Sequence, residues 1–272
     1  MNADVDYEVE YNNRARVPEN PAIIAGWAKD AAAWRERHVP RAIPYGPTAR
    51  NRIDFFQGDT EGPIVVFIHG GYWQALESSF FSHLARGLNA HGISVAIPSY
   101  ELCPGVTVDH IIREMRMATR ELARLERSLV MSGHSAGGHL AACMLATDWP
   151  AYDVSLPQDL VTAAYAISGL FDLGPLIETS INNALHLDHA TARAASPLFW
   201  NPPRRGSLDA MVGENESAEY FRQSRTIVER WGAAGVATRF GTVPNANHFT
   251  AIAPLADPDS PMVARLKQLA GR

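Results

Sequence analysis

Short apolar runs alternate with segments of helical periodicity along most of the chain. Near-continuous apolar runs are typical of strands that are buried on both faces of a sheet. We expect such strands at residues 64–68, 93–97, 129–131, 163–167, 208–212 and 237–240. Apolar residues spaced three and four apart predict helices between them, at 80–88, 111–125, 140–145 and 220–231. This alternation predicts an α/β fold with a mostly parallel sheet and helices on both faces.

The flanking and interrupting segments complete this prediction. Residues 52–56 alternate in polarity and predict a strand that pairs antiparallel at one edge, while residues 21–37 predict a lead-in helix. Glycines and prolines break the regular pattern across residues 169–206, which we expect to form a small cap over the carboxyl end of the sheet. Because no repeat or long linker is visible, we expect residues 1–272 to form a single domain.

Composition narrows the possible partners. The 272 residues carry 24 Lys+Arg and 29 Asp+Glu, a formal charge of −5, which offers no electrostatic footprint for nucleic acid or an anionic membrane surface. The N-terminus lacks the basic and apolar stretches of a secretory signal, so a cytoplasmic location is expected. Cys103 and Cys143 have apolar neighbours and are expected to be buried thiols. The sequence is compatible with a homodimer.

The segment Gly133-His134-Ser135-Ala136-Gly137 is the first candidate for chemistry. It has the pattern G-x-S-x-G, it follows a predicted strand, and a predicted helix begins near Gly138. Flanking glycines allow the sharp turn that makes the serine Oγ project from the sheet, and the helix N-terminus favours developing negative charge. This context indicates that Ser135 is a nucleophile.

A second motif, His69-Gly70-Gly71-Tyr72-Trp73, lies directly after the strand at 64–68. Adjacent glycines let backbone N–H groups turn toward a reacting oxygen, and two such donors stabilise a tetrahedral acyl intermediate. We expect the oxyanion hole to use the N–H groups of Gly71 or Tyr72 together with that of Ala136.

A serine nucleophile also needs a base and an acid, which follow it along the chain when the serine lies in a G-x-S-x-G turn. Among the histidines, only His248 lies downstream of a late strand, whereas His134 and His139 flank the serine itself. For the acid, Glu214 and Glu216 both lie in the loop after the strand at 208–212. Spacing alone does not choose between these two.

Four segments together resemble the α/β-hydrolases of the kynurenine formamidase (arylformamidase) type and their bacterial esterase relatives. They are residues 69–73, residues 133–140, Ile167-Ser168-Gly169-Leu170-Phe171-Asp172-Leu173 and Asn247-His248-Phe249. In that family the acid precedes an R-Q-S helix, and here Glu216-Ser217-Ala218-Glu219-Tyr220 leads into Arg222-Gln223-Ser224. The resemblance therefore implies that Glu216 is the acid, although glutamate replaces the family's usual aspartate and Glu214 remains a rival.

The resemblance implies a serine hydrolase that cleaves an aryl formamide, similar to N-formylkynurenine, without a metal or an organic cofactor. Tyr72, Trp73 and Phe249 would form an apolar wall for a small-molecule substrate. The alternatives are a carboxylesterase for short-chain or aryl esters and, more remotely, a non-catalytic ligand-binding protein on the same fold.

Overall fold

A single eight-stranded sheet forms the centre of the computed structural model, which describes residues 5–271. The strands are β1 (Arg41–Pro44), β2 (Arg52–Phe56), β3 (Ile64–Ile68), β4 (Val95–Pro98), β5 (Leu129–His134), β6 (Val161–Ile167), β7 (Ser207–Gly213) and β8 (Ala237–Val243). Their order across the sheet is β1-β2-β4-β3-β5-β6-β7-β8. The strands from β4 to β8 in this order pair in parallel, whereas β1 and β2 are antiparallel to their neighbours.

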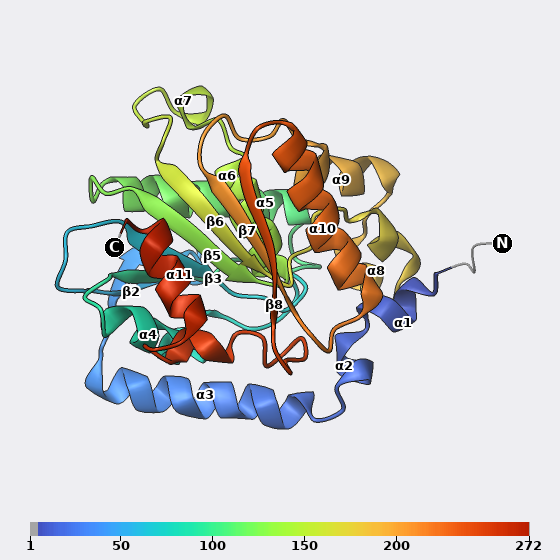
Figure 1. Ribbon diagram of the computed structural model, residues 1–272, viewed down its shortest axis with the longest axis horizontal. Helices are drawn as coiled ribbons and strands as arrows, with labels where there is room; N and C mark the ends of the chain where they lie inside the picture. The colour runs from blue at the N-terminus through green and yellow to red at the C-terminus, as the bar shows by residue number, and fades with distance from the viewer. Residues whose placement is uncertain (1–4, 272) are drawn as a thin grey trace.

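Helices cover both faces of this sheet (Figure 1). The α-helices are α1 (Tyr7–Tyr11), α2 (Asn13–Arg16), α3 (Asn20–Arg37), α4 (Ala85–Asn89), α5 (Val108–Ala123), α6 (Ala136–Leu145), α7 (Trp149–Tyr152), α8 (Asn182–Leu185), α9 (His189–Ala194), α10 (Ala218–Ala233) and α11 (Pro261–Leu269). Short 3₁₀ helices are η1 (Ser78–Leu84), η2 (Gly174–Glu178), η3 (Pro197–Phe199) and η4 (Ala253–Ala256). Helices α5, α6 and α10 pack on one face, and α3, α4 and α11 pack on the other. The predicted α/β-hydrolase architecture is confirmed.

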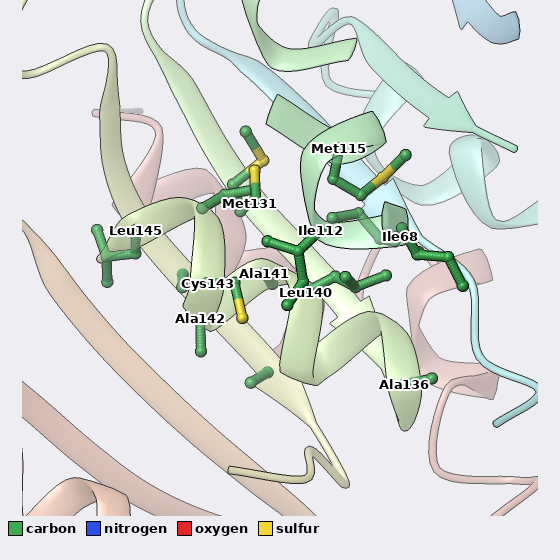
Figure 2. Packing of buried hydrophobic residues seen from close by; sticks show 14 of the residues in the cluster. Ile68, Ile112, Met115, Met131, Ala136, Leu140, Ala141, Ala142, Cys143 and Leu145 are labelled. Carbon is green, nitrogen blue, oxygen red and sulfur yellow. The ribbon is translucent and has the colours of Figure 1, made fainter. Parts of the chain in front are cut away.

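Buried strands separate two apolar layers. Along β5, Leu129 and Met131 belong to the layer under α5 and α6, whereas Val130 between them belongs to the opposite layer. Helix α6 is buried over its whole length, and Figure 2 shows its residues Leu140 and Cys143 packed beside Met131. Burial on both faces is why β5 has no alternation in its sequence.

Two predictions made from the sequence, one about the sheet and one about a helix, differ from the structure. Residues 52–56 do form an antiparallel strand, β2, but it lies one position inside the edge, which is formed by β1. Strand β1 is short and largely exposed, so it has no apolar alternation that could reveal it. The region 80–88 is mostly the 3₁₀ helix η1 followed by the short α4, rather than one α-helix.

Residues 169–206 form a chain of short helices, η2, α8, α9 and η3. His139 of α6 ties this segment to the core, because its Nε2 lies 2.7 Å from the carbonyl oxygen of Ala195. At the amino end of the chain, α1 lies beside the first turn of α10 (Figure 1), and the backbone N–H of Glu219 donates to the Glu10 carboxylate. No helix within residues 5–271 has the length and apolarity to cross a bilayer.

Val130→Ala tests the central layer. Val130 is fully buried, so removing its two methyl groups should lower the free energy of unfolding by about 2 kcal/mol. Val154→Ala is the matched control: this side chain is 92% exposed, and we expect a change within about 0.5 kcal/mol. Urea unfolding monitored by circular dichroism measures both. Equal effects of the two substitutions would contradict this account of the core.

Candidate active site

Ser135 lies in a strained turn at the junction between β5 and α6. Its backbone has φ 55° and ψ −118°, in a region that non-glycine residues rarely occupy. The glycines around it are required by close backbone approach, since a Cβ atom at Gly133 would overlap the carbonyl oxygen of Gly137, and one at Gly137 would overlap that of Ile68. The packing of β3, β5 and α6 therefore holds the turn and presents the Ser135 side chain at the carboxyl end of the sheet.

His248 follows β8 and is joined to Glu216, which follows β7. His248 Nδ1 lies 2.7 Å from Glu216 Oε2, and the Glu216 side chain is fully buried. The other carboxylate oxygen accepts hydrogen bonds from the Gly213 N–H, at 2.7 Å, and from the Ser168 hydroxyl. With its oxygens so occupied, the Glu216 carboxylate is held in one orientation against the imidazole.

Glu214, the rival acid, lies elsewhere. Its side chain is exposed and accepts a hydrogen bond from the backbone N–H of Asn245 at 2.9 Å, which holds the loop after β8. The structure therefore pairs His248 with Glu216 and leaves Glu214 at the surface.

His134 supports the loop that carries His248. Its Nε2 lies 2.8 Å from the His248 carbonyl oxygen, so this nitrogen must carry the proton and donate it. Burial, together with the nearby His248, holds the pKa of His134 well below its usual range, so the ring stays neutral. His134 is thus a positioning residue beside the His248 ring, with a centroid separation of 4.7 Å.

The Ser135 Oγ is buried and makes no hydrogen bond to any residue between 5 and 271. Ser135 and His248 nevertheless line the same pocket. Hydrogen bonds between catalytic groups are commonly long in a ligand-free enzyme and tighten when substrate is bound.

The loop after β3 has the backbone shape expected of an oxyanion hole. Gly71, Tyr72 and Trp73 all have positive φ, at 106°, 48° and 57°. Within the described part of the chain, the N–H groups of Tyr72 and Ala136 have no hydrogen-bond acceptor. Tyr100 holds the first residue of this loop in place. Its ring stacks on that of His69 with centroids 4.2 Å apart, and its hydroxyl donates to the His69 carbonyl oxygen at 2.8 Å.

The pocket has a volume of about 380 Å³ and is lined by Ser135, His248, Tyr72 and Phe249 among others. Trp73, which the sequence analysis placed in the substrate wall, does not line it. That side chain is fully buried and packs edge-on against His139, with ring centroids 5.0 Å apart. The positive φ of successive loop residues turns neighbouring side chains in different directions, so Tyr72 borders the pocket while Trp73 enters the core.

A network of hydroxyl groups, which sequence reasoning missed, connects Tyr72 of the pocket lining to Tyr11 and Tyr220. The Tyr72 hydroxyl donates to the carbonyl oxygen of Tyr11 at 2.6 Å and lies 2.7 Å from the Tyr220 hydroxyl. Asn13 donates to the Tyr220 oxygen at 2.7 Å. Because the Tyr72 proton is already used, Tyr220 is the donor between the two tyrosines. Burial raises the pKa of Tyr220 far above its usual value, so its hydroxyl stays protonated beside His248.

These residues come from segments without a recognisable motif. Tyr11 and Asn13 lie in α1 and α2, which no catalytic pattern marks. Tyr220 alone could have been suspected from the sequence, because it lies four residues after Glu216 in the segment that leads into α10.

One group of potential metal ligands lies away from the pocket. Ligand atoms of Glu101, His110 and Glu114 lie within 4.8 Å of one another, and none of these residues lines the pocket. They already bind one another and the protein: His110 Nε2 is 3.1 Å from Glu101, and Glu114 accepts the Glu101 N–H at 2.8 Å. We assign no metal to this group.

Comparison with known proteins places this geometry in context. A model described as the alpha/beta hydrolase family matches residues 65–270. Kynurenine formamidase from Danio rerio is 30% identical over 241 residues, covering 85% of this chain and 81% of that protein. Kynurenine formamidase from Drosophila melanogaster is 27% identical over 244 residues, covering 84% of this chain and 80% of that protein.

An esterase and a putative thioesterase are also similar to this chain. An isoprenylcysteine alpha-carbonyl methylesterase from Arabidopsis thaliana is 26% identical over 164 residues, covering 55% of this chain and 38% of that protein. The crystal structure of a putative thioesterase from Silicibacter sp. TM1040 aligns with a TM-score of 0.85 and 34% identity, covering 96% of this chain and 98% of that chain.

Substitution of the two glutamates separates their roles. Glu216→Gln leaves His248 without its carboxylate partner and should lower kcat by about 10³-fold or more. Glu214→Gln, at an exposed position in the same loop, should stay within about twofold of the wild type. Steady-state hydrolysis of an activated aryl ester measures both. The reverse order of effects would transfer the acid role to Glu214.

Buried neutral histidines should make the protein sensitive to acid. Burial lowers the pKa of His69 to about 3 and that of His139 to about 4. The unfolded chain, with ordinary histidine pKa values near 6.5, therefore binds more protons between about pH 6.5 and 4. As the pH is lowered through this window, the free energy of unfolding should decrease by up to about 1.4 kcal/mol per pH unit for each histidine. Above pH 7 these histidines are neutral in both states and should not change the free energy of unfolding.

Urea unfolding at pH 7.5, 6 and 5 measures this dependence. His139→Gln keeps a donor for the Ala195 carbonyl oxygen. It should reduce the slope of the unfolding free energy against pH by the amount that corresponds to about one bound proton. An unfolding free energy that is the same at pH 7.5 and pH 5 would show that these histidines titrate normally in the folded protein.

Proposed function

The chain belongs to the alpha/beta hydrolase family, and we propose that it is a serine hydrolase of the kynurenine formamidase type, cleaving an aryl formamide or a related amide. The observation that carries this proposal is the pairing of His248 with the buried Glu216 beside a strained Ser135, in a pocket bordered by Tyr72 and Phe249. Similarity to kynurenine formamidases over most of both chains supports the substrate class.

The proposed reaction is acyl transfer through Ser135. As its Oγ bonds to the formamide carbon, His248 Nε2 takes the hydroxyl proton, and the Glu216 carboxylate stabilises the imidazolium. The N–H groups of Tyr72 or Gly71 and of Ala136 hold the oxyanion. His248 then protonates the leaving nitrogen as the C–N bond breaks. Water, deprotonated by His248, attacks the formyl ester and releases formate and free Ser135.

Other parts of the molecule enter this proposal. We take residues 169–206 as a small cap, because Ser180 and Ile181 from that segment line the pocket. The reaction needs no metal or organic cofactor. A cytoplasmic location is compatible with Cys103 and Cys143, which are both free and buried.

A carboxylesterase is the alternative, favoured by the esterase and thioesterase neighbours and by the use of glutamate as the acid. The same serine, base and oxyanion hole would cleave an aryl ester. The two activities differ in the leaving group, because an amine must be protonated before it departs, whereas a good alkoxide or phenoxide needs less assistance.

The ratio of kcat/KM for N-formyl-L-kynurenine to that for p-nitrophenyl acetate decides between them, because it measures differential binding of the two transition states. We expect a large preference for the formamide, with stoichiometric formate release. A preference for the ester, with the formamide almost untouched, would make the protein an esterase.

Ser135→Ala and His248→Ala should each remove nearly all turnover of either substrate, leaving only the residual effect of binding and the oxyanion hole. Labelling with a fluorophosphonate reports whether Ser135 is a competent nucleophile. A folded wild-type protein that is not labelled would instead indicate a non-catalytic ligand-binding role.

A further inference from the structure

Arg14 is held at the pocket by the residues immediately before it. Asn13 donates to the hydroxyl oxygens of Tyr220 and Tyr72, and the Tyr11 carbonyl oxygen accepts the Tyr72 proton. These bonds join helix α2 to the loop after β3, which carries Tyr72, and to α10. Arg14, the next residue, lies in the pocket lining together with Ser135 and His248.

The pocket is otherwise almost free of fixed charge. Among the lining residues within 5–271, Arg14 is the only lysine, arginine, aspartate or glutamate. Its remaining polar lining consists of neutral groups such as Asn12, Gln74 and Ser180. A substrate that enters this pocket therefore meets one permanent positive charge and no negative charge from the lining.

The Arg14 guanidinium is also uncommitted. Between residues 5 and 271 it forms no ion pair and no side-chain hydrogen bond. Of the acidic residues that precede it, Glu8 accepts hydrogen bonds from the backbone and hydroxyl of Ser180, and Glu10 accepts one from the Glu219 N–H. Glu19, five residues after Arg14, lines a neighbouring hollow and not this pocket. Five N–H donors in a planar fork thus remain available at the pocket, in the geometry that matches a carboxylate.

Arg14 and Ser135 differ in their exposure to solvent. Ser135 is 1% exposed, whereas Arg14 is exposed to solvent. A substrate could therefore bring its carbonyl to Ser135 while a carboxylate stays at the mouth of the pocket, close to water. This arrangement avoids the high cost of burying an anion completely.

We propose that Arg14 binds a carboxylate of the substrate, so that the enzyme selects aryl formamides or esters that carry a carboxylate over those that lack one. This inference rests on the proposed function. It adds that a residue of α2 recognises this carboxylate, which lies on a part of the molecule remote from the scissile bond.

A matched pair of substrates tests this selection. 4-(2-Formamidophenyl)-4-oxobutanoate and the corresponding butanamide share one scaffold and one scissile bond, and they differ in the negative charge. The 2-acetoxyphenyl pair serves in the same way if the enzyme prefers esters. We expect kcat/KM to be about tenfold higher for each carboxylate than for its amide, because a hydrogen bond to a charged group stabilises the complex.

Three variants identify the residue responsible. Arg14→Gln should abolish the preference while changing kcat/KM for the neutral amide less than twofold, and Arg14→Lys should retain part of it. Arg16→Gln is the control, because Arg16 belongs to the same helix but lines a neighbouring hollow and not this pocket. It should leave the preference unchanged. Raising the ionic strength should weaken the preference of the wild type and leave that of Arg14→Gln unaffected.

Each other result would overturn the inference. Equal kcat/KM for carboxylate and amide in the wild type would show that the enzyme does not recognise the charge. An equal loss on both substrates in Arg14→Gln would mean that Arg14 only maintains the N-terminal segment. An effect of Arg16→Gln as large as that of Arg14→Gln would indicate a general surface field instead of a binding residue.

A binding measurement separates this inference from the proposed function. If neither substrate pair is turned over, the proposed function fails, and the Kd of Ser135→Ala for 4-(2-aminophenyl)-4-oxobutanoate and for its amide still reports on Arg14. Calorimetry should give about tenfold tighter binding of the carboxylate, lost when Arg14→Gln is added. Equal Kd values would refute the role of Arg14 independently of catalysis.

Discussion

The turn between β5 and α6 is the constraint on which the rest of the site depends. It holds Ser135 at a positive φ that costs conformational free energy, of order 1–3 kcal/mol for such strained residues. The surrounding structure maintains this conformation because Gly133 and Gly137 allow β3, β5 and α6 to approach without side chains between them. The buried layers on both faces of β5 supply the rigidity that a loop alone would not have.

Around this turn, the pairing of Glu216 with His248 joins two loops that are far apart in sequence from Ser135. The carboxylate is fixed by Gly213 and Ser168 as well as by the imidazole. His134 then holds the backbone of His248 from the other side. Because these groups follow neighbouring strands of the parallel sheet, their carboxyl ends bring the side chains to one edge, as expected for ligand sites in open α/β sheets.

The N-terminal segment contributes more to the pocket than its sequence suggests. Helix α1 is attached to α10 through the Tyr11 hydroxyl, which donates to Glu219 at 2.7 Å, and α2 is attached through Asn13. The segment is thereby part of the substrate pocket and not a loose extension. Arg14 is the one lysine or arginine of residues 5–271 that lines the pocket, and it is the residue to which we assign recognition of a substrate carboxylate.

Four features could be predicted before any contact was known: the parallel sheet, the turn at Ser135, the glycine-rich loop at Gly71 and the position of His248 after the last strand. These features depend on local patterns: apolar runs, glycines that allow close approach, and strand-to-helix junctions. Long-range packing was needed to show that Glu216 contacts His248 while Glu214 faces solvent, that Trp73 enters the core, and that Asn13 and Arg14 reach the pocket. The same holds for the contact between the Tyr220 and Tyr72 hydroxyls. Such contacts join segments distant in the chain, and side-chain direction in a loop follows from φ and ψ values that residue type does not specify.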